Sequence, residues 1–285
     1  MKTTILKRRL GYIYLCCIPI LTIFFAFVTG HISYKLYVPI WLLNFVLMGM
    51  AVGFLGANAF TGYDREKRQL LAAGCLLVLP ICFLAILFGM GPPPDTREEW
   101  VATAVEQKIR FDILLAGGIF VALGLSLTKL ILNERGEKLY AQLGHTAILI
   151  AIPVFLIVTS FWHSFALHAY KVRLESNTKQ PQEWFAAMAQ QIWILTICEI
   201  LLTYFAIAMF ARSLMLTQIF KRTPAFVYIL FCTIAIISVL CFPLYPGSAP
   251  FSGFPYYPFM IPAIPIIICY YIGVNLIRYA GTRRD

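Results

Sequence analysis

Eight long apolar runs dominate this sequence, and they constrain the fold more than any other feature. Each run has about the 20 residues that an α-helix needs to cross the hydrocarbon core of a bilayer. The chain is 60% hydrophobic and 13% charged, whereas soluble domains carry about 25% charged residues. We therefore predict an all-α fold, a polytopic transmembrane helix bundle. Its expected spans cover residues 11–29, 37–60, 70–90, 112–132, 146–168, 190–211, 224–244 and 258–278.

The distribution of basic residues predicts how this bundle lies in its membrane. Of the 23 Lys and Arg residues, 16 fall near the chain ends or in the connections that share their side when eight spans are counted. Cytoplasmic loops are enriched in Lys and Arg, so we expect both termini in the cytoplasm. Residues 1–285 are interpreted as a single integral membrane domain of the plasma membrane, which is the bacterial inner membrane in a prokaryote.

Two segments that precede expected spans resemble each other. The segment "EWVATAVEQ" covers residues 99–107 and "EWFAAMAQQ" covers residues 183–191, and both place apolar residues at helical spacing. Trp is enriched where a membrane meets water. We therefore expect two short amphipathic helices on the outer surface, anchored there by Trp100 and Trp184. An internal duplication and independent convergence of two interfacial helices both explain the resemblance.

The stretch "IWILTICEILLTYFAIAMF", residues 192–210, carries one acid, Glu199, inside an expected span. An ionisable side chain at that depth is costly and usually faces the interior of a bundle or water. Thr196 and Thr203 stand three residues before it and four residues after it, which gives the helix one polar face. Two interpretations stay open. Glu199 binds a proton, a cation or a substrate group, or it is a neutral acid that joins two helices by a hydrogen bond.

His163 is the expected partner of Glu199. It lies near the outer end of the preceding span, with Ser160 on the same face of the helix. Consecutive antiparallel helices are usually neighbours, so we expect His163 and Glu199 to come within reach of each other. Asn44, in the second span, has a similar expected depth and completes a predicted outer-half polar cluster. The alternatives are a His bonded to a backbone carbonyl and an Asn that joins two helices.

Signatures of catalysis, metal binding and cofactor binding are missing from the sequence. It contains no P-loop, no GxSxG, no HExxH and no Rossmann glycine pattern. All eight cysteines lie in expected spans without the spacing of a metal site. His163 and His168 point apart on a helix, so they make a poor pair of haem ligands. We therefore predict no catalytic residues, no metal and no cofactor.

Three classes of function remain. The favoured class is small-solute transport or ligand binding through the outer-half polar cluster. The alternative is a non-catalytic accessory or sensory subunit that binds a membrane protein partner. An intramembrane enzyme that acts on lipid is least favoured, because such a site needs more clustered polar residues than these runs contain. Whether the protein is an enzyme stays open, with a non-catalytic role favoured. The lipid bilayer is the expected partner in every class, and the dispersed basic residues do not indicate nucleic-acid binding.

Overall fold

Helices make up almost all of the described structure. The computed structural model describes residues 2–61, 64–92, 94, 96–176, 183–241, 257–261 and 263–282. Eight stretches of this part are long and apolar enough to cross a membrane, which confirms the predicted number of spans and the all-helical class. The elements in chain order are α1 (Lys2–Thr29), α2 (Tyr34–Thr61), α3 (Arg65–Leu84), α4 (Leu87–Met90), α5 (Arg97–Ala102), α6 (Ala104–Glu134), α7 (Leu139–Ser160), η1 (Phe161–Ala166), α8 (Leu167–Glu175), α9 (Glu183–Leu216), α10 (Arg222–Cys241), η3 (Tyr257–Met260) and α11 (Ala263–Ala280).

The fifth and sixth spans belong to helices that extend past their expected outer ends. The fifth was predicted to end at residue 168, but α7, the π-helical segment η1 and α8 follow one another without a break as far as Glu175. The sixth belongs to a single helix, α9, that already begins at Glu183. The segment 183–191 is therefore the first part of a long helix and not a separate short one. The reason is local, because no Pro or Gly interrupts the sequence of α9.

The other Trp-bearing segment, residues 99–107, is divided between α5 and α6 at Thr103. The start of α5 is fixed by Thr96, whose Oγ1 accepts a hydrogen bond of 3.3 Å from the backbone N–H of Glu99. The last residues of the seventh expected span, 242–244, lie outside the described residues.

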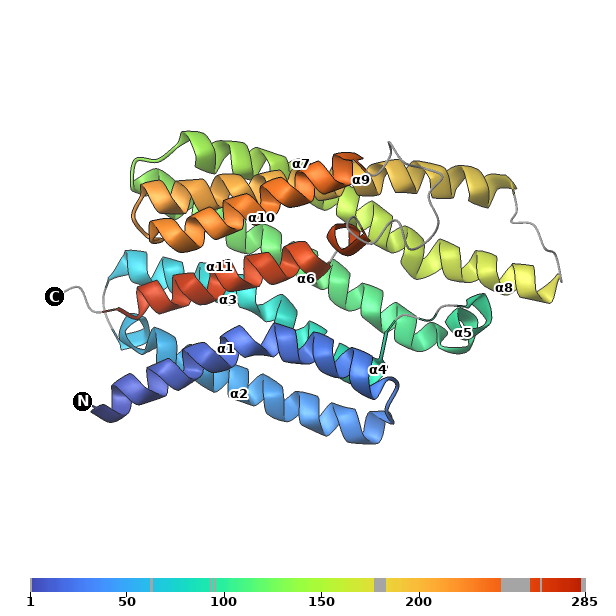
Figure 1. Ribbon diagram of the computed structural model, residues 1–285, viewed down its shortest axis with the longest axis horizontal. Helices are drawn as coiled ribbons and strands as arrows, with labels where there is room; N and C mark the ends of the chain where they lie inside the picture. Colours follow the sequence, from blue (N-terminus) through green and yellow to red (C-terminus); the bar gives the residue numbers. More distant parts are fainter. Residues whose placement is uncertain are drawn as a thin grey trace.

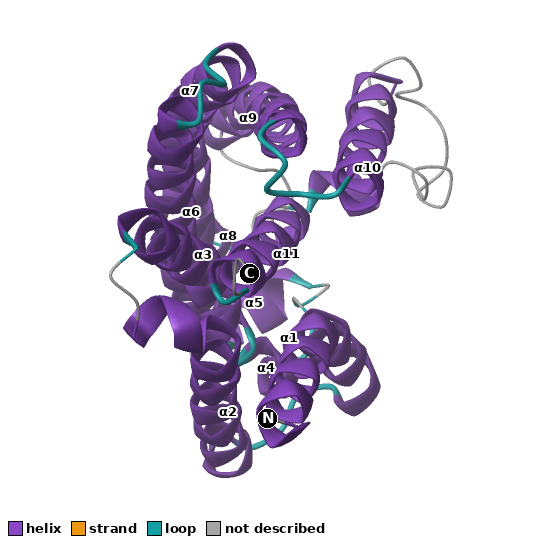
Figure 2. Cartoon of the chain, turned by 90° about the vertical axis from the view of Figure 1, so that its left-hand side faces the viewer, coloured by secondary structure: helices purple, strands orange, loops and turns teal. Residues whose placement is uncertain are grey.

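Both ends of the described chain lie at the same end of the bundle (Figure 1), as an even number of spans requires. We refer to this as the terminal end, and to the opposite end, which carries α4, α5 and α8, as the distal end. In a view from the terminal end, α3 and α11 occupy the middle, α7 and α9 lie on one side, α1 and α2 on the opposite side, and α10 at the periphery (Figure 2). The burial agrees with this arrangement, since α3 and α11 contain the most buried spans.

Two glycines bring the central helices together. A Cβ atom on Gly74 of α3 would lie 2.8 Å from the carbonyl oxygen of Gly273 of α11, and one on Gly273 would lie 2.8 Å from the carbonyl oxygen of Gly74. These distances are shorter than side chains tolerate, so only glycine at both positions permits this crossing. Small residues at helix crossings are a common means of packing in membranes, where backbone approach increases dispersion contacts.

A proline in α1 leaves one backbone carbonyl without its helical partner, and two tyrosines of α11 donate hydrogen bonds to the backbone at this level. Pro19 has no N–H, so it cannot bond the carbonyl of Leu15 four residues earlier. Tyr270 Oη donates a hydrogen bond of 2.6 Å to that carbonyl oxygen. Tyr271 Oη donates one of 2.9 Å to the next carbonyl, that of Cys16. Lipid offers no water to satisfy a freed carbonyl, so these bonds attach α1 to α11 at the level of the break.

Side chains of α2 and α6 donate similar hydrogen bonds to the backbone carbonyls at the break between α3 and α4 and at the end of α4. Trp41 Nε1 of α2 donates a hydrogen bond of 2.8 Å to the carbonyl of Cys82, in the last turn of α3. Arg110 of α6 donates from Nη2 to the carbonyls of Met90 and Gly91, both at 2.8 Å. The buried side chain of Arg110 places its positive charge at the C-terminal end of α4, where the carbonyl dipoles of a helix favour a cation.

At the terminal end, Arg135 joins four helices. This residue directly follows α6, and its Nε donates a hydrogen bond of 2.6 Å to Glu66 of α3. Its Nη1 donates at 3.0 Å to the carbonyl of Thr217 after α9, and its Nη2 donates at 3.1 Å to Tyr279 of α11. A guanidinium group has five donors in a fixed plane, so one side chain sets the positions of these helix ends.

We predict that Tyr270→Phe lowers the free energy of unfolding by about 0.6–2 kcal/mol, because the Leu15 carbonyl then loses its partner in an apolar surrounding. Thermal unfolding of the purified protein in detergent micelles measures the change. The effect should shrink when Pro19→Ala is present, because an alanine at position 19 supplies the N–H that α1 lacks. An equal loss in both backgrounds would contradict this explanation of the Tyr270 bond.

Candidate functional site

Glu199 of α9 is buried between helices, with a residue exposure of 6%. Its Oε1 accepts a hydrogen bond of 2.9 Å from Thr203 Oγ1, one turn further along α9. The carboxyl group borders a cavity of about 20 Å³ that lies between α6, α7, α9 and α11. Glu199 and Thr203 therefore form the pair that their spacing on the helix predicts. Thr196 is not part of this pair, because its hydroxyl donates to the carbonyl of Ile192 at 2.7 Å.

His163 has a different partner from the expected one. Its Nε2 lies 3.3 Å from Asp112 Oδ1 of α6, and its Nδ1 lies 2.8 Å from the hydroxyl of Ser164. Phe155 lines the cavity beside Glu199, and His163 follows Phe155 by eight residues, which is about 12 Å along a helix. His163 thus lies about two helical turns beyond the level of Glu199 and contacts Asp112 of α6, so the predicted His163–Glu199 contact is not formed.

The remaining members of the expected outer-half cluster are also separated. Asn44 Oδ1 accepts a hydrogen bond of 2.6 Å from Tyr14 Oη, which joins α2 to α1. Ser160 is exposed at the end of α7. Asn44 thus has the helix-joining contact that was its alternative interpretation, and Asn44, His163 and Glu199 do not share one site. Among the described residues, no group of three or more His, Cys, Asp and Glu side chains is placed to hold a metal ion.

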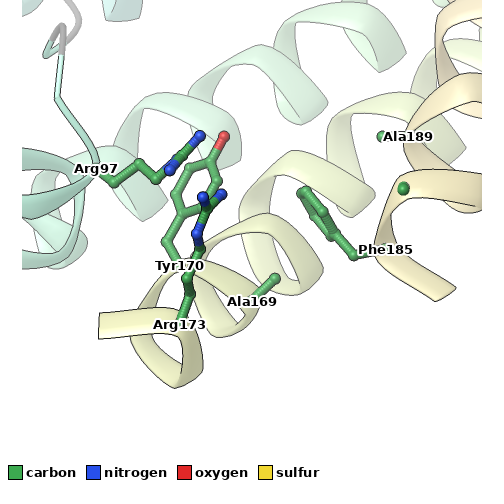
Figure 3. A pocket seen from close by; sticks show the side chains of 7 residues that line it. Arg97, Ala169, Tyr170, Arg173, Phe185 and Ala189 are labelled. Atoms are coloured by element: carbon green, nitrogen blue, oxygen red, sulfur yellow. The ribbon is translucent and has the colours of Figure 1, made fainter. Parts of the chain in front are cut away.

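A larger cavity lies at the distal end, where α5, α8 and α9 meet. It has a volume of about 320 Å³, and we name it the Arg97–Arg173 pocket. Its lining consists of Arg97 from α5, Ala169, Tyr170 and Arg173 from α8, and Phe185, Ala186 and Ala189 from α9. Figure 3 shows the Arg97 and Arg173 side chains beside the Tyr170 ring on one side of the pocket, and Phe185 on the other side.

Aromatic side chains pack against one another beside this pocket. The Tyr170 ring packs edge-on against Trp100, with centroids 6.2 Å apart, and against Phe185, with centroids 6.1 Å apart. Trp100 is itself stacked on Phe111 of α6 at 6.1 Å, and its Nε1 donates a hydrogen bond of 2.7 Å to the carbonyl of Pro94. Aromatic pairs in this geometry are worth about 0.5–1.5 kcal/mol beyond their buried area. The ring of Tyr170 is therefore fixed between the segment of Trp100 and that of Phe185.

The helices that form the pocket are longer than a bilayer is thick. The stretch from α7 to α8 has 37 residues and α9 has 34, which correspond to about 55 Å and 51 Å. The hydrocarbon core of a bilayer measures about 30 Å. Tyr170 follows Leu139 by 31 residues, so it lies about 46 Å from the terminal end of α7. The pocket is thus farther from the terminal end than the hydrocarbon core is thick, and its lining includes Tyr and Arg side chains, which are favourable near membrane surfaces.

The sequence contained part of the signal for this pocket. One wall comes from the segment 183–191, and Trp100 of the similar segment 99–107 packs behind the Tyr170 wall without lining the pocket. Trp100 supports the pocket, while Trp184 is 42% exposed and packs edge-on against Phe185. Arg97 and Arg173 appeared only as basic residues in two different connections. Their proximity depends on the packing of α5 against α8, which no local pattern predicts.

Comparisons of the chain with protein-family models, with curated proteins and with solved structures find no match. The function is therefore argued from the geometry of the two cavities.

We predict that the side-chain nitrogen resonances of His163 shift in Asp112→Asn and stay unchanged in Glu199→Gln. The reason is that Asp112 lies against the imidazole ring, whereas Glu199 is about two helical turns away. Nuclear magnetic resonance of the protein labelled at histidine nitrogens makes the measurement. A shift of the His163 signals in Glu199→Gln of the same size as in Asp112→Asn would show that the two side chains interact after all.

Proposed function

We propose that this multi-pass membrane protein binds an anionic amphiphile in the Arg97–Arg173 pocket. The observation that carries the proposal is the combination of two guanidinium groups with an apolar wall in a cavity of about 320 Å³. This volume is at the lower end of the range for small-molecule sites, about 300–1,000 Å³.

The charged side of the pocket favours a phosphate or carboxylate group. Arg97 and Arg173 approach the same ring, that of Tyr170, from two different helices. Guanidinium groups present several donors in one plane, which matches the oxygen pairs of carboxylates and phosphates. The Tyr170 hydroxyl adds a further donor for the same group. A ligand with one negative headgroup is therefore supported over a neutral or cationic one.

The opposite side of the pocket favours an apolar portion of the same ligand. Phe185, Ala186 and Ala189 of α9 present two methyl groups and one aromatic ring, and Ala169 of α8 adds a methyl group beside the arginines. Ligand sites commonly combine such a surface with a few polar groups that fix the orientation. A molecule with its charge at the arginines and its hydrocarbon against α9 satisfies both sides. This pairing is what a phospholipid, or a soluble anion with an acyl chain, provides.

The proposal concerns binding and not passage through the membrane. The cavity beside Glu199 measures about 20 Å³, which is room for about one water molecule. A solute large enough to fill the distal pocket therefore does not fit in the cavity beside Glu199. The geometry supports the ligand-binding part of the leading class of function, with the ligand held at the surface of the bilayer.

We further propose that the distal end faces the outside of a plasma membrane. The support is the charge distribution, because 16 of the 23 basic residues belong to the chain ends and connections assigned to the terminal side. The Arg97–Arg173 pocket then meets the outer leaflet, and its ligand is a lipid of that leaflet or an amphiphile that arrives from outside.

We predict that Arg97→Gln combined with Arg173→Gln weakens binding of a short-chain phosphatidic acid by at least about tenfold. Charge-assisted hydrogen bonds contribute about 1.5–3 kcal/mol each, and about 1.4 kcal/mol corresponds to a factor of ten. Thermophoresis of the purified full-length protein in an uncharged detergent measures the affinity. Phosphatidylcholine with the same acyl chains tests the need for an anionic headgroup. Inorganic phosphate tests the need for the acyl chains.

Lys171→Gln is the matched control for this experiment. Lys171 is exposed on the same helix as Arg173, pairs with Glu175 and does not line the pocket. This variant should bind phosphatidic acid as the wild-type protein does. Equal weakening by the control variant, or equal binding of phosphatidic acid and phosphatidylcholine, would contradict the proposed role of the pocket. Binding of inorganic phosphate as tight as that of phosphatidic acid would identify the ligand as a soluble anion and remove the role of the apolar wall.

A further inference from the structure

A second site lies inside the bundle, where Glu199 borders the small cavity between α6, α7, α9 and α11. The polar groups of its lining are the Glu199 carboxyl, the Thr203 hydroxyl and the Cys269 thiol, and the other lining residues are apolar. We propose that Glu199, Thr203 and one water molecule in this cavity form a site that binds and releases a single proton. This inference is independent of the anionic ligand proposed for the distal pocket.

The hydrogen bond of Thr203 distinguishes it from other threonines in these helices. Thr128, Thr196 and Thr233 each donate to the backbone carbonyl four residues earlier. Thr203 instead donates to the side chain of the residue four positions earlier, Glu199 Oε1. The hydroxyl hydrogen is thus committed to one carboxyl oxygen, which acts as an acceptor. The other carboxyl oxygen is left to carry the proton or to meet the water.

The surroundings of Glu199 contain no cation among the described residues that line the cavity. Helix α6 contributes Gly118 and Val121, α7 contributes Ile148, Ile152 and Phe155, and α11 contributes Pro265, Ile266 and Cys269. The titratable groups near the carboxyl are the Cys269 thiol, the Tyr204 phenol and, behind Tyr204, the Cys232 thiol of α10. Tyr204 Oη donates at 3.2 Å to the carbonyl of Phe259. An ionised carboxylate here has no ion-pair partner, so the proton decides whether the middle of the bundle is charged.

The cavity provides the route for the proton over its first step. A volume of about 20 Å³ exceeds the 10–15 Å³ or so that one water molecule needs. That water accepts the proton from the carboxyl group, leaving a carboxylate and a hydronium ion, and returns it in the reverse step. The carboxyl group of Glu199 keeps the Thr203 hydrogen bond in the protonated and the ionised state. The proton is therefore exchanged without breaking this contact within α9.

Binding of a proton at Glu199 would change how closely the neighbouring helices pack. Glu199 of α9 borders a cavity whose other lining residues come from α6, α7 and α11, and α9 contacts each of these three helices. A charge formed there attracts water into the cavity, and the apolar lining opposes this. Protonation therefore couples to how closely α6, α7 and α11 approach α9, which is a property that a transport or sensory protein uses.

Infrared difference spectroscopy of the full-length protein in bilayers tests the proposal. The carboxylic-acid C=O band is recorded over the titration range of buried carboxyl groups, about pH 4 to 9. We expect a band that is lost as the pH rises, that is absent in Glu199→Gln, and that moves in frequency in Thr203→Val. Thr196→Val is the matched control, because its hydroxyl bonds the backbone, and it should leave the band in place.

Two results would overturn the proposal. One is a protein in which no carboxylic-acid band responds to Glu199→Gln at any pH, so that Glu199 is always ionised. The other is a Glu199 band that stays constant over the whole range, so that the proton is structural and never exchanged. If Glu199→Gln does not accumulate, Thr203→Val assigns the band in protein labelled with ¹³C-glutamate, and an unmoved spectrum then counts against the site.

Discussion

The need to satisfy every backbone carbonyl within the bilayer determines how this bundle is held together. Side chains from neighbouring helices take the carbonyls that a proline or a helix end leaves without a partner. Tyr270 does so for α1, Trp41 for α3 and Arg110 for α4. Apolar burial contributes little specificity here, because lipid is as apolar as the protein interior. These directed bonds, with the close crossing of Gly74 and Gly273, therefore select the arrangement of the helices.

The same requirement explains why several polar residues are structural. Asn44 joins two helices through Tyr14, and Arg135 gathers four helix ends through its guanidinium group. In a sequence, such residues look like candidates for a binding site, because any polar group in an apolar run is costly. The free energy that it costs to bury these polar side chains is offset by hydrogen bonds to other helices. Glu199 differs, because its partner is on its own helix and its carboxyl borders a cavity.

The two candidate sites have different chemistry because they lie at different depths. The Arg97–Arg173 pocket is at the distal end, and the proposed function places it among lipid headgroups, where cations and aromatic rings are readily accommodated. The Glu199 cavity is inside the bundle, where it has room for about one water molecule and one exchangeable proton. The proposed binding of a ligand at the distal end and the proposed binding of a proton in the interior thus rest on different residues and can be tested separately.

The sequence by itself determined the class of protein, the number of spans, and the Glu199–Thr203 pair, because these depend on composition and on spacing along one helix. It did not determine the partner of His163 or the meeting of Arg97 with Arg173, because these depend on how the helices are rotated and packed against one another. A helix turns by about 100° per residue, so a few residues of difference in register change which side chains meet. That register is set by contacts between helices, and only the tertiary structure contains them.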